Sequence, residues 1–311
     1  MSLIEQAAKR LEELRRAGIE APDAAPAHDE RIEPAVTVQK MKRARHDAQV
    51  QREQLDGSAD GHSAESRHVH LDLARLAAAG LVTPDAPRSH LADEFRVIKR
   101  PLITNATGKG ASPLHNGNLI MVTSALEGEG KSFTAANLAM SIAMELDHTV
   151  LLVDADVARS SIPGMLGLPE SRGLLDVLVS GDDLRDVLLR TDIEKLSVLP
   201  AGTPHPRATE LLASDSMNDL LDEISARYAD RIVVFDSPPL LLTTEARVLA
   251  THMGQVVIVV EAQHTSQADV KHALATIESC PVKMVMLNKA RVVPGGENYR
   301  YGYGYSYGYS R

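Results

Sequence analysis

One stretch of the sequence combines glycines with a lysine and a serine in a spacing that suits phosphate binding. Residues 125–132 read Ala-Leu-Glu-Gly-Glu-Gly-Lys-Ser, between an apolar run and a segment with helical periodicity. Backbone N–H groups of such a loop can hold phosphates, its lysine can reach the β- and γ-phosphates, and its serine can bind Mg²⁺. The alternative is an ordinary glycine-rich turn, since Ala125 stands where the common pattern has glycine. We expect a P-loop whose nucleotide contacts come from Gly128, Glu129, Gly130, Lys131, Ser132 and Phe133.

Two further apolar runs end in acidic residues. Residues 150–153 are followed by Asp154 and Asp156, and residues 232–235 by Asp236. Asp236 fits the role of holding Mg²⁺, directly or through water. Each aspartate alone could instead be a cap. Because the three elements follow one another on predicted strands, together they predict nucleotide binding.

The last apolar run bears on which base is bound. A guanine site usually has Asn-Lys-x-Asp at this place, and residues 288–291 read Asn-Lys-Ala-Arg. The acidic residue that reads guanine is missing, so ATP is favoured over GTP. Asn288 could contact the base or form a turn.

The elements that must position these residues alternate along the chain. Strands are predicted at 119–123, 150–153, 196–199, 232–235, 256–260 and 282–287, and helices at 131–146, 174–179, 209–227 and 267–277. Strands of Val, Ile and Leu that alternate with helices indicate a mostly parallel sheet flanked by helices. The predicted fold class is an α/β P-loop NTPase with its ligand at the carboxyl ends of the strands.

The rest of the chain divides by composition. With 311 residues and 44% hydrophobic content it can form one large domain with extra segments or two modest domains. Residues 1–19 predict an amphipathic helix that packs on protein or lies on a membrane surface. Residues 20–70 are rich in Ala, Pro and charged residues and predict a flexible linker, 71–293 the P-loop domain, and 294–311 a disordered tail.

The tail holds most of the tyrosine. Six of the seven tyrosines in the chain lie in it. Nearly all are separated by single Gly or Ser residues, so the tail has no apolar face and its hydroxyl groups are the useful feature. The six are Tyr299, Tyr301, Tyr303, Tyr305, Tyr307 and Tyr309.

Composition excludes several classes of protein. No run approaches the ~18 apolar residues of a membrane-spanning helix, no secretory signal is visible, and the single Cys280 allows no internal disulfide. The net charge of −9 disfavours nucleic acid as a partner. His62, His68 and His70 lack the other ligands of a metal site. We expect a cytoplasmic protein.

From Leu71 to the C-terminus the sequence resembles the bacterial protein-tyrosine kinases that accompany exopolysaccharide synthesis. The resemblance lies in the P-loop 128–132, the Asp-x-Asp at 153–156, the Asp-Ser-Pro-Pro at 235–239 and the tyrosine cluster 299–309. Segments 2–5, 85–88 and 94–100 look like the cytoplasmic branch of exosortase polysaccharide loci. The resemblance to this family implies a P-loop fold of the SIMIBI or MinD-like type.

The resemblance also implies an activity and partners. Lys131, Ser132, Asp154 and Asp236 would hold ATP and Mg²⁺, with Asp156 or Asp154 assisting the tyrosine hydroxyl. The tail would be phosphorylated in trans within a homo-oligomer. A separate membrane chain-length determinant would activate the kinase and recruit it to the inner membrane, and a protein-tyrosine phosphatase would act on it. Oligomerisation would use Asp93, Arg96 and Lys99.

The sequence departs from the family pattern at three positions. Glu127 stands where the family often has Pro, Ala158 where an Arg usually follows the Asp-x-Asp, and Lys99 replaces an Arg of the oligomerisation motif. Two other functions remain open. A ParA- or MinD-like switch ATPase would carry a lysine early in the P-loop, where this chain has Leu126. A noncatalytic nucleotide-sensing scaffold for polysaccharide export would bind ATP without phosphorylating the tail.

Overall fold

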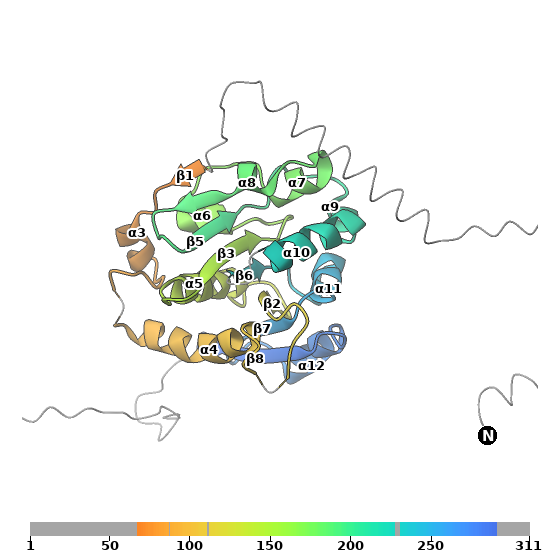
Figure 1. The fold of residues 1–311 in the computed structure, drawn as a ribbon. Coiled ribbons are helices and arrows are strands. Elements are labelled where there is room, and N and C mark those ends of the chain that lie inside the picture. The colour runs from red at the N-terminus through yellow and green to blue at the C-terminus, as the bar shows by residue number, and fades with distance from the viewer. Residues whose placement is uncertain (1–66, 87, 111, 228–230, 291–311) are drawn as a thin grey trace, which may run out of the picture. The chain divides into compact units, whose positions relative to one another are not determined.

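The computed structural model describes residues 67–86, 88–110, 112–227 and 231–290. Within these residues the strands form one sheet in the order β1-β4-β5-β3-β6-β2-β7-β8, and all neighbours are parallel except β4 and β5 (Figure 1). The mostly parallel sheet is therefore confirmed. The strands are β1 Arg67–Val69, β2 Leu119–Ser124, β3 Thr149–Asp154, β4 Leu189–Thr191, β5 Leu196–Leu199, β6 Arg231–Asp236, β7 Gln255–Glu261 and β8 Val282–Asn288.

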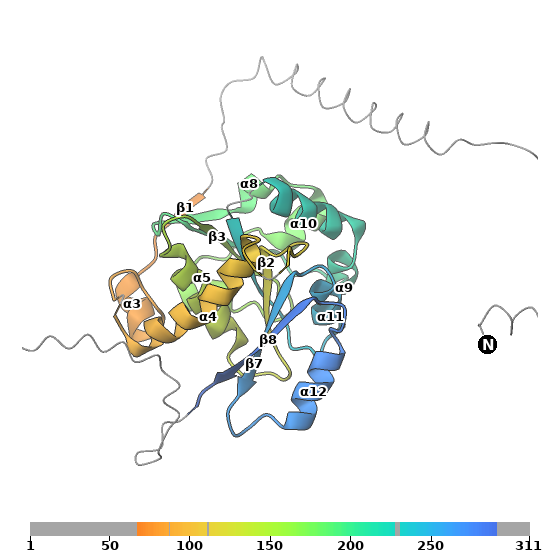
Figure 2. The ribbon, with the colours of Figure 1, turned by 60° about the horizontal axis from the view of Figure 1, so that its bottom comes forward.

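Helices cover both faces of this sheet. Helices α3 to α6 contribute buried side chains to one apolar cluster, and α7 to α12 contribute to the other. Figure 2 shows α4 and α5 together on the face of the sheet that α3 to α6 cover. The helices are α3 Leu73–Ala78, α4 His90–Ala106, α5 Lys131–Ala143, α6 Ile162–Leu166, α7 Leu174–Ser180, α8 Leu184–Val187, α9 Ala208–Leu212, α10 Asp215–Arg227, α11 Thr244–Ala250 and α12 Gln267–Ala275.

The central strands are apolar on both faces because both faces are covered. On β3, Leu151 and Val153 enter one cluster while Leu152 enters the other, and β6 alternates in the same way. Side chains that alternate between two helical layers explain why these strands read as continuous Val, Ile and Leu. The polar residues that follow the strands are thereby brought to one edge of the sheet.

One helix differs from the sequence prediction and another contains a proline, each for an identifiable reason. The predicted helix 209–227 is two helices, because the Ser214 hydroxyl accepts a hydrogen bond from the Met217 N–H at 3.3 Å and caps α10. Helix α4 continues through Pro101 to Ala106. Proline removes the hydrogen bond to the carbonyl of Val97, and Val97 is exposed, so water can take that carbonyl.

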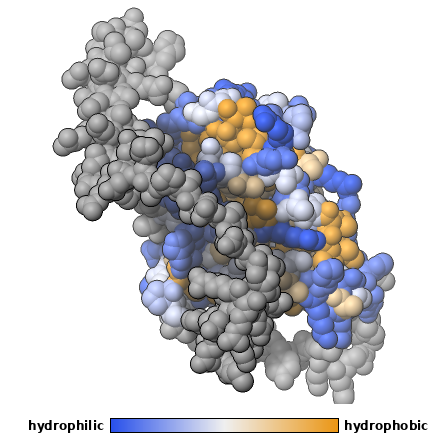
Figure 3. All heavy atoms as spheres, turned by 90° about the vertical axis from the view of Figure 1, so that its right-hand side faces the viewer, coloured by the Kyte–Doolittle hydropathy of each residue, from blue (hydrophilic) through white to orange (hydrophobic). Residues whose placement is uncertain are grey.

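The described fold also extends beyond the predicted elements. Strand β1 lies at 67–69, within the segment predicted as linker to residue 70, because it pairs with β4 at the sheet edge. Strand β4 and helices α6, α8 and α11 were not predicted from the sequence pattern. The face shown in Figure 3 is largely polar where it is described, with apolar residues in separate areas. Among the described residues, no helix is both long and apolar enough to span a bilayer.

Candidate functional site

The glycine-rich loop joins the end of β2 to the start of α5. Gly128 and Gly130 have φ values of 84° and 97°, in the left-handed region that glycine adopts without strain. A Cβ on Gly130 would also overlap the side-chain amide of Asn288. Gly130 caps α5, whose first N–H groups have no partner within the helix and are available to phosphate oxygens. The loop therefore has the local structure of a P-loop.

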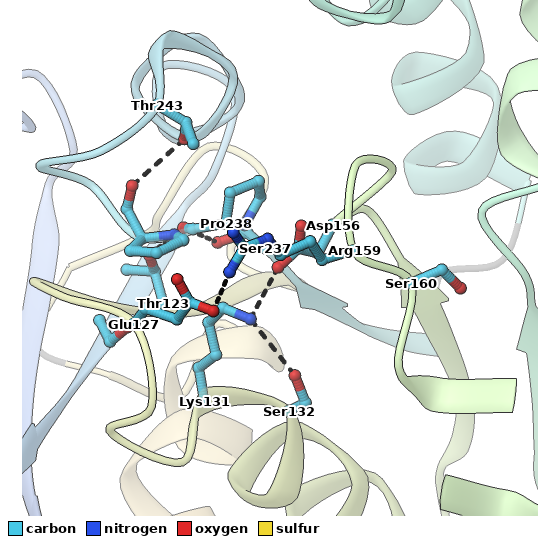
Figure 4. A network of polar contacts seen from close by, with 12 residues as sticks. Thr123, Glu127, Lys131, Ser132, Asp156, Arg159, Ser160, Ser237, Pro238 and Thr243 are labelled. Atoms are coloured by element: carbon cyan, nitrogen blue, oxygen red, sulfur yellow. Dashed lines mark hydrogen bonds and ion pairs between the residues drawn. The ribbon is translucent and has the colours of Figure 1, made fainter. Parts of the chain in front are cut away.

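Lys131 and Asp156 form an ion pair across the site. The Lys131 Nζ lies 2.7 Å from Asp156 Oδ2 and 3.4 Å from Ser132 Oγ, as Figure 4 shows. Both side chains are largely buried, with 14% and 4% exposed. The structure thus brings together three of the predicted site residues, and Lys131 is neutralised by the second acid of the Asp-x-Asp.

Asp154 and Asp236 end the neighbouring strands β3 and β6 and lie opposite each other in the register of the sheet. Asp154 Oδ2 accepts hydrogen bonds from Ser160 Oγ at 2.8 Å and the Ile162 N–H at 3.2 Å. Its Oδ1 and both carboxylate oxygens of Asp236 are buried and have no hydrogen-bond partner among the described residues. Burial raises the pKa of Asp154 to about 6 and that of Asp236 to about 7.

These unpartnered oxygens test whether the site suits a divalent cation. Buried carboxylate oxygens without a donor are costly unless a cation or proton satisfies them. Mg²⁺ takes oxygen ligands, usually one or two carboxylates plus waters and phosphates. Ser132 lies in the first turn of α5 and supplies a hydroxyl. The donor set of Ser132, Asp154 and Asp236 therefore fits Mg²⁺.

Glu127 and Arg159 form a second ion pair between the P-loop and the segment after β3. Arg159 Nη1 contacts Glu127 Oε1, and both side chains are exposed, at 68% and 57%. The Glu127 carboxylate is therefore directed at an arginine. Glu127 is one of the positions at which the sequence departs from the family pattern, and Arg159 directly follows another, Ala158. The sequence pattern alone gave no reason to pair Glu127 with Arg159.

Glu129 turns into the protein, away from the site opening. Its Oε2 accepts the Leu126 N–H at 2.6 Å, and its Oε1 accepts the Thr265 hydroxyl and, at 3.4 Å, the Glu261 N–H. Residue 129 is 2% exposed. The Glu129 side chain thus holds the P-loop to the segment after β7, and its expected contact with nucleotide is restricted to the backbone.

The end of β8 holds the same loop from the other side. Asn288 Nδ2 donates to the Glu129 carbonyl at 2.9 Å. Lys289 Nζ donates to the Gly128 carbonyl at 2.8 Å and lies 3.0 Å from Glu261 Oε2. Asn288 therefore supports the P-loop backbone. Thr265, Glu261 and Lys289 were missed from the sequence, where only their place at the ends of β7 and β8 pointed to the site.

Phe133, the last P-loop residue predicted to contact nucleotide, is partly buried. It lies against the apolar cluster that α3 to α6 share. Its expected contact with nucleotide is therefore restricted to its backbone N–H in the first turn of α5.

The residues predicted for oligomerisation lie on α4 but have different surroundings. Asp93 and Arg96 form an ion pair one turn apart. Lys99 is 3% exposed, its ammonium lies 2.8 Å from Glu145 Oε1, and it donates to the Ser141 carbonyl. Lys99 therefore holds α4 to the end of α5 within this chain. The six tail tyrosines and the helix predicted at 1–19 lie outside the described residues.

Comparisons with known proteins agree with this geometry. A family model described as an AAA domain matches residues 117–289, more than half of the chain. The tyrosine-protein kinase YwqD of Bacillus subtilis is 34% identical over 206 residues, covering 65% of this chain and 83% of YwqD. CapB of Staphylococcus aureus is 28% identical over 224 residues, covering 71% of this chain and 94% of CapB.

A solved structure is also similar. The crystal structure of the chimerical protein CapA2B2 superposes with a TM-score of 0.57 at 27% identity and covers 71% of this chain and 92% of that one. The α/β P-loop fold expected from the sequence is thus confirmed. On the family match, the identity to YwqD and the site geometry, the chain belongs to the bacterial tyrosine-protein kinase family, with its AAA domain at residues 117–289.

Proposed function

We propose that this protein is an ATP-dependent tyrosine autokinase that phosphorylates the cluster Tyr299–Tyr309 of its own tail and thereby regulates exopolysaccharide synthesis and export. The polysaccharide role rests on the resemblance to the bacterial protein-tyrosine kinases, and the exosortase-associated branch rests on the sequence segments 2–5, 85–88 and 94–100. The observation that carries the activity is the ion pair of Lys131 with Asp156 beside the buried Asp154 and Asp236. It joins a phosphate-binding cation to a carboxylate that can accept a proton.

Nucleotide binding exchanges the partner of Lys131. The triphosphate of ATP lies in the P-loop, with its oxygens accepting hydrogen bonds from the N–H groups at the start of α5. The Lys131 ammonium moves from Asp156 to the β- and γ-phosphates. Asp156 is thereby left without its ion-pair partner, and its carboxylate can accept a hydrogen bond from the tyrosine hydroxyl.

Mg²⁺ would be held by Ser132, Asp154 and Asp236. Bound there, it supplies neutralisation of the negative charge on the phosphates of ATP. The residues of this chain supply the remainder of the chemistry, which is positioning and proton transfer.

In the transfer step the tyrosine hydroxyl oxygen forms a bond to the γ-phosphorus, and the bond from the γ-phosphorus to the β,γ-bridging oxygen breaks. The products are phosphotyrosine and ADP, and the phenolic proton passes to a carboxylate. A free tyrosine has a pKa near ~10, so an acceptor in the site favours the attack. Lys131 stabilises the charge that moves toward the ADP oxygens.

Asp156 is the better candidate for that acceptor. Oδ2 of Asp154 already accepts two hydrogen bonds, from Ser160 and Ile162, and the unpartnered Oδ1 is suited to the cation. Asp156 pairs with Lys131, and phosphates compete for that lysine. The order of events then follows from charge, because ATP must bind before Asp156 can act.

The substrate is the tail of a neighbouring copy in a homo-oligomer. We propose that α4, with Asp93 and Arg96, contributes to the contacts between copies. Each phosphotyrosine adds about −1.5 to −2 charges at neutral pH. Several on one tail would repel a chain whose net charge is already −9, so phosphorylation should loosen the oligomer. A protein-tyrosine phosphatase would reverse the change.

We also propose a membrane partner that activates the kinase and recruits it to the inner membrane. The support is the likeness to CapB and to the chimerical protein CapA2B2. A cytoplasmic peptide of a polysaccharide chain-length determinant should raise the rate of tail phosphorylation. Full-rate phosphorylation by the purified chain, unchanged by such a peptide, would contradict this part of the proposal.

Intact-mass spectrometry of the full chain after incubation with ATP and Mg²⁺ tests the activity. Mass increments of phosphate that map to peptides containing Tyr299–Tyr309 are expected in the unaltered protein and not in Lys131→Met. A chain in which the six tail tyrosines are replaced by Phe should show no mass increments of phosphate while retaining ATP binding. ATP binding without phosphate on the tail, with the activating peptide present, would instead support a switch ATPase or a scaffold.

A further inference from the structure

The loops on the two sides of the site are joined by two ion pairs of different burial. Lys131 pairs with Asp156 inside the site, and Arg159 pairs with Glu127 at its exposed edge. Each pair links the P-loop to the segment after β3, and Figure 4 shows them close together. The backbone places Arg159 on the same turn as Asp156, because the Arg159 N–H donates to the Asp156 carbonyl at 3.0 Å.

We propose that Arg159 is a phosphate-binding residue whose guanidinium is held by Glu127 until ATP enters. This inference rests on the proposed function only in taking ATP as the ligand. We assign the terminal phosphate of ATP as the ligand of Arg159. The reason is that Arg159 lies on the same turn as Asp156, whose carboxylate pairs with Lys131. Ala158, where an arginine is usual, cannot make that contact, and the next side chain along supplies the guanidinium instead.

Charge at the site favours a second cation from the protein in addition to Mg²⁺. The P-loop and the segment 154–160 carry two cationic side chains, Lys131 and Arg159. The same two segments and the end of β6 carry a larger number of carboxylates, among them the buried Asp154, Asp156 and Asp236. In the absence of nucleotide each of the two cations is neutralised by a carboxylate on the opposite loop. A triphosphate is strongly anionic, so it is held well only when both cations turn from the carboxylates to its oxygens.

The exposed pair is suited to such an exchange. Ion pairs between exposed side chains contribute only about 0–1 kcal/mol, because water screens them. Arginine bonded to phosphate is charge-assisted and often bidentate, which makes it a stronger interaction. Arg159 therefore loses little when it leaves Glu127. Glu127 competes with the phosphate for the same guanidinium and weakens ATP binding by doing so.

A purely structural role makes a different prediction. If the pair only fastened the two loops together, Glu127→Gln and Arg159→Ala would remove the same contact and change ATP binding in the same direction. If Arg159 binds phosphate, the two changes act in opposite directions. The double variant should then behave like Arg159→Ala, because Glu127 acts only through Arg159.

The test is calorimetric titration of the full chain with ATP and with ADP in the presence of Mg²⁺. Arg159→Ala should weaken ATP binding about tenfold, the loss of one charge-assisted contact, and ADP binding much less. Glu127→Gln should bind ATP more tightly than the unaltered chain. Arg172→Ala is the matched control, since it removes another exposed arginine that pairs with an aspartate, Asp182.

Urea unfolding without nucleotide shows whether the variants are folded, and Arg159→Lys keeps the charge should the alanine variant unfold. ATP affinity within twofold of the unaltered chain in Arg159→Ala would overturn the inference, as would equal weakening by Glu127→Gln and Arg159→Ala. Tail phosphorylation with no effect of Arg159 on ATP binding would overturn this inference alone. An effect of Arg159 on ATP binding in a chain that leaves its tail unmodified would overturn the autokinase proposal alone.

Discussion

Asp154 and Asp236 lie directly opposite each other on the parallel strands β3 and β6, and both are fully buried. Burial and the repulsion between two adjacent negative charges both disfavour the ionised forms of these two carboxyl groups. Burial is the main cause that raises the pKa of Asp236 to about 7, and the nearby Asp154 adds to it, while the Lys131 charge opposes it. The site without ligands is therefore under electrostatic stress that a cation relieves.

Replacing Asp236 by Asn should stabilise the chain in the absence of nucleotide and Mg²⁺. An unfolded Asp titrates near ~3.9, and Asp236 in the folded chain near about 7. The folded state binds more protons between these values, so stability falls as pH rises from ~4 to ~7 and stays reduced above. At pH 8 the free energy of unfolding of Asp236→Asn should exceed that of the unaltered chain by on the order of 1–3 kcal/mol.

Urea unfolding at pH 5 and pH 8 measures this difference. The gain should shrink at pH 5, where the buried carboxyl is largely protonated. Asp219→Asn, an exposed residue of α10, is the matched control and should show little change at either pH. A loss of stability at pH 8 would mean that Asp236 is not the source of the stress. The same variant should bind MgATP more weakly, since it lacks a carboxylate for the cation.

The sequence predicted the sheet well where burial determines residue type. Strand β5 was predicted with its observed bounds and the other central strands to within one residue at each end, because Val and Ile runs covered on both faces have no other common explanation. Prediction failed where a long-range contact decides. Strand β1 exists through its pairing with β4, which lies about 120 positions further along the chain.

The site was predicted by position but only partly by contact. Strand ends indicated Lys131, Asp154 and Asp236, since residues that follow parallel strands meet at one edge. The directions of side chains depend on tertiary packing, which the local sequence does not report: the Glu129 side chain is buried and the Phe133 side chain packs against an apolar cluster. The contact of Glu127 with Arg159 joins residues 32 positions apart, and no local pattern reports it.

Replacing Asp156 by Asn should abolish tail phosphorylation while sparing ATP binding. The amide cannot accept the phenolic proton, and it also releases Lys131, which then meets the phosphates without a competitor. General base catalysis contributes about 10²–10⁴-fold, so the rate should fall by at least about 100-fold. Phosphate incorporation by intact-mass spectrometry and ATP titration give the two readouts.

Asp154→Asn provides the comparison for this prediction. Because Asp154 fits the cation site, its variant should weaken binding of MgATP as well as slow transfer. Unchanged tail phosphorylation in Asp156→Asn would remove Asp156 from the role of proton acceptor. A loss of transfer confined to Asp154→Asn, with ATP binding retained, would assign that role to Asp154.

The buried Glu129 should make the P-loop sensitive to changes in the segment after β7. Thr265→Val removes the hydroxyl that donates to Glu129 Oε1 and should cost about 1 kcal/mol in the free energy of unfolding. Glu129→Gln places an N–H₂ group among donors and should cost about 1–3 kcal/mol. ATP titration should show weaker binding in both variants.

Thr276→Val is the matched control for the threonine change. Its hydroxyl bonds the Ala273 carbonyl at the end of α12, away from the P-loop, so stability can change there without an effect on ATP binding. If Thr265→Val and Thr276→Val change ATP affinity equally, the link between Glu129 and the P-loop has no part in binding.

The buried ion pair of Lys99 with Glu145 should stabilise the chain more than the exposed pair of Arg96 with Asp93 on the same helix. Burial already lowers the pKa of Lys99. Glu145→Gln leaves the Lys99 ammonium without its counter-charge. It should reduce the free energy of unfolding by about 2 kcal/mol, less than for a fully buried pair because Glu145 remains 22% exposed. Asp93→Asn should change it by only about 0–1 kcal/mol.

Lys99→Met separates this packing role from a role between copies. Methionine fills the buried stem without a charge, so Lys99→Met should cost less than Glu145→Gln, and the double variant should resemble Lys99→Met alone. Urea unfolding ranks the unaltered chain, the two single variants and the double variant by their free energy of unfolding. Light scattering gives the oligomer size of each. Because Lys99 contacts Glu145 and Ser141 within its own chain, its loss should alter stability before it alters oligomer size. A smaller oligomer at unchanged stability would place Lys99 at the interface instead.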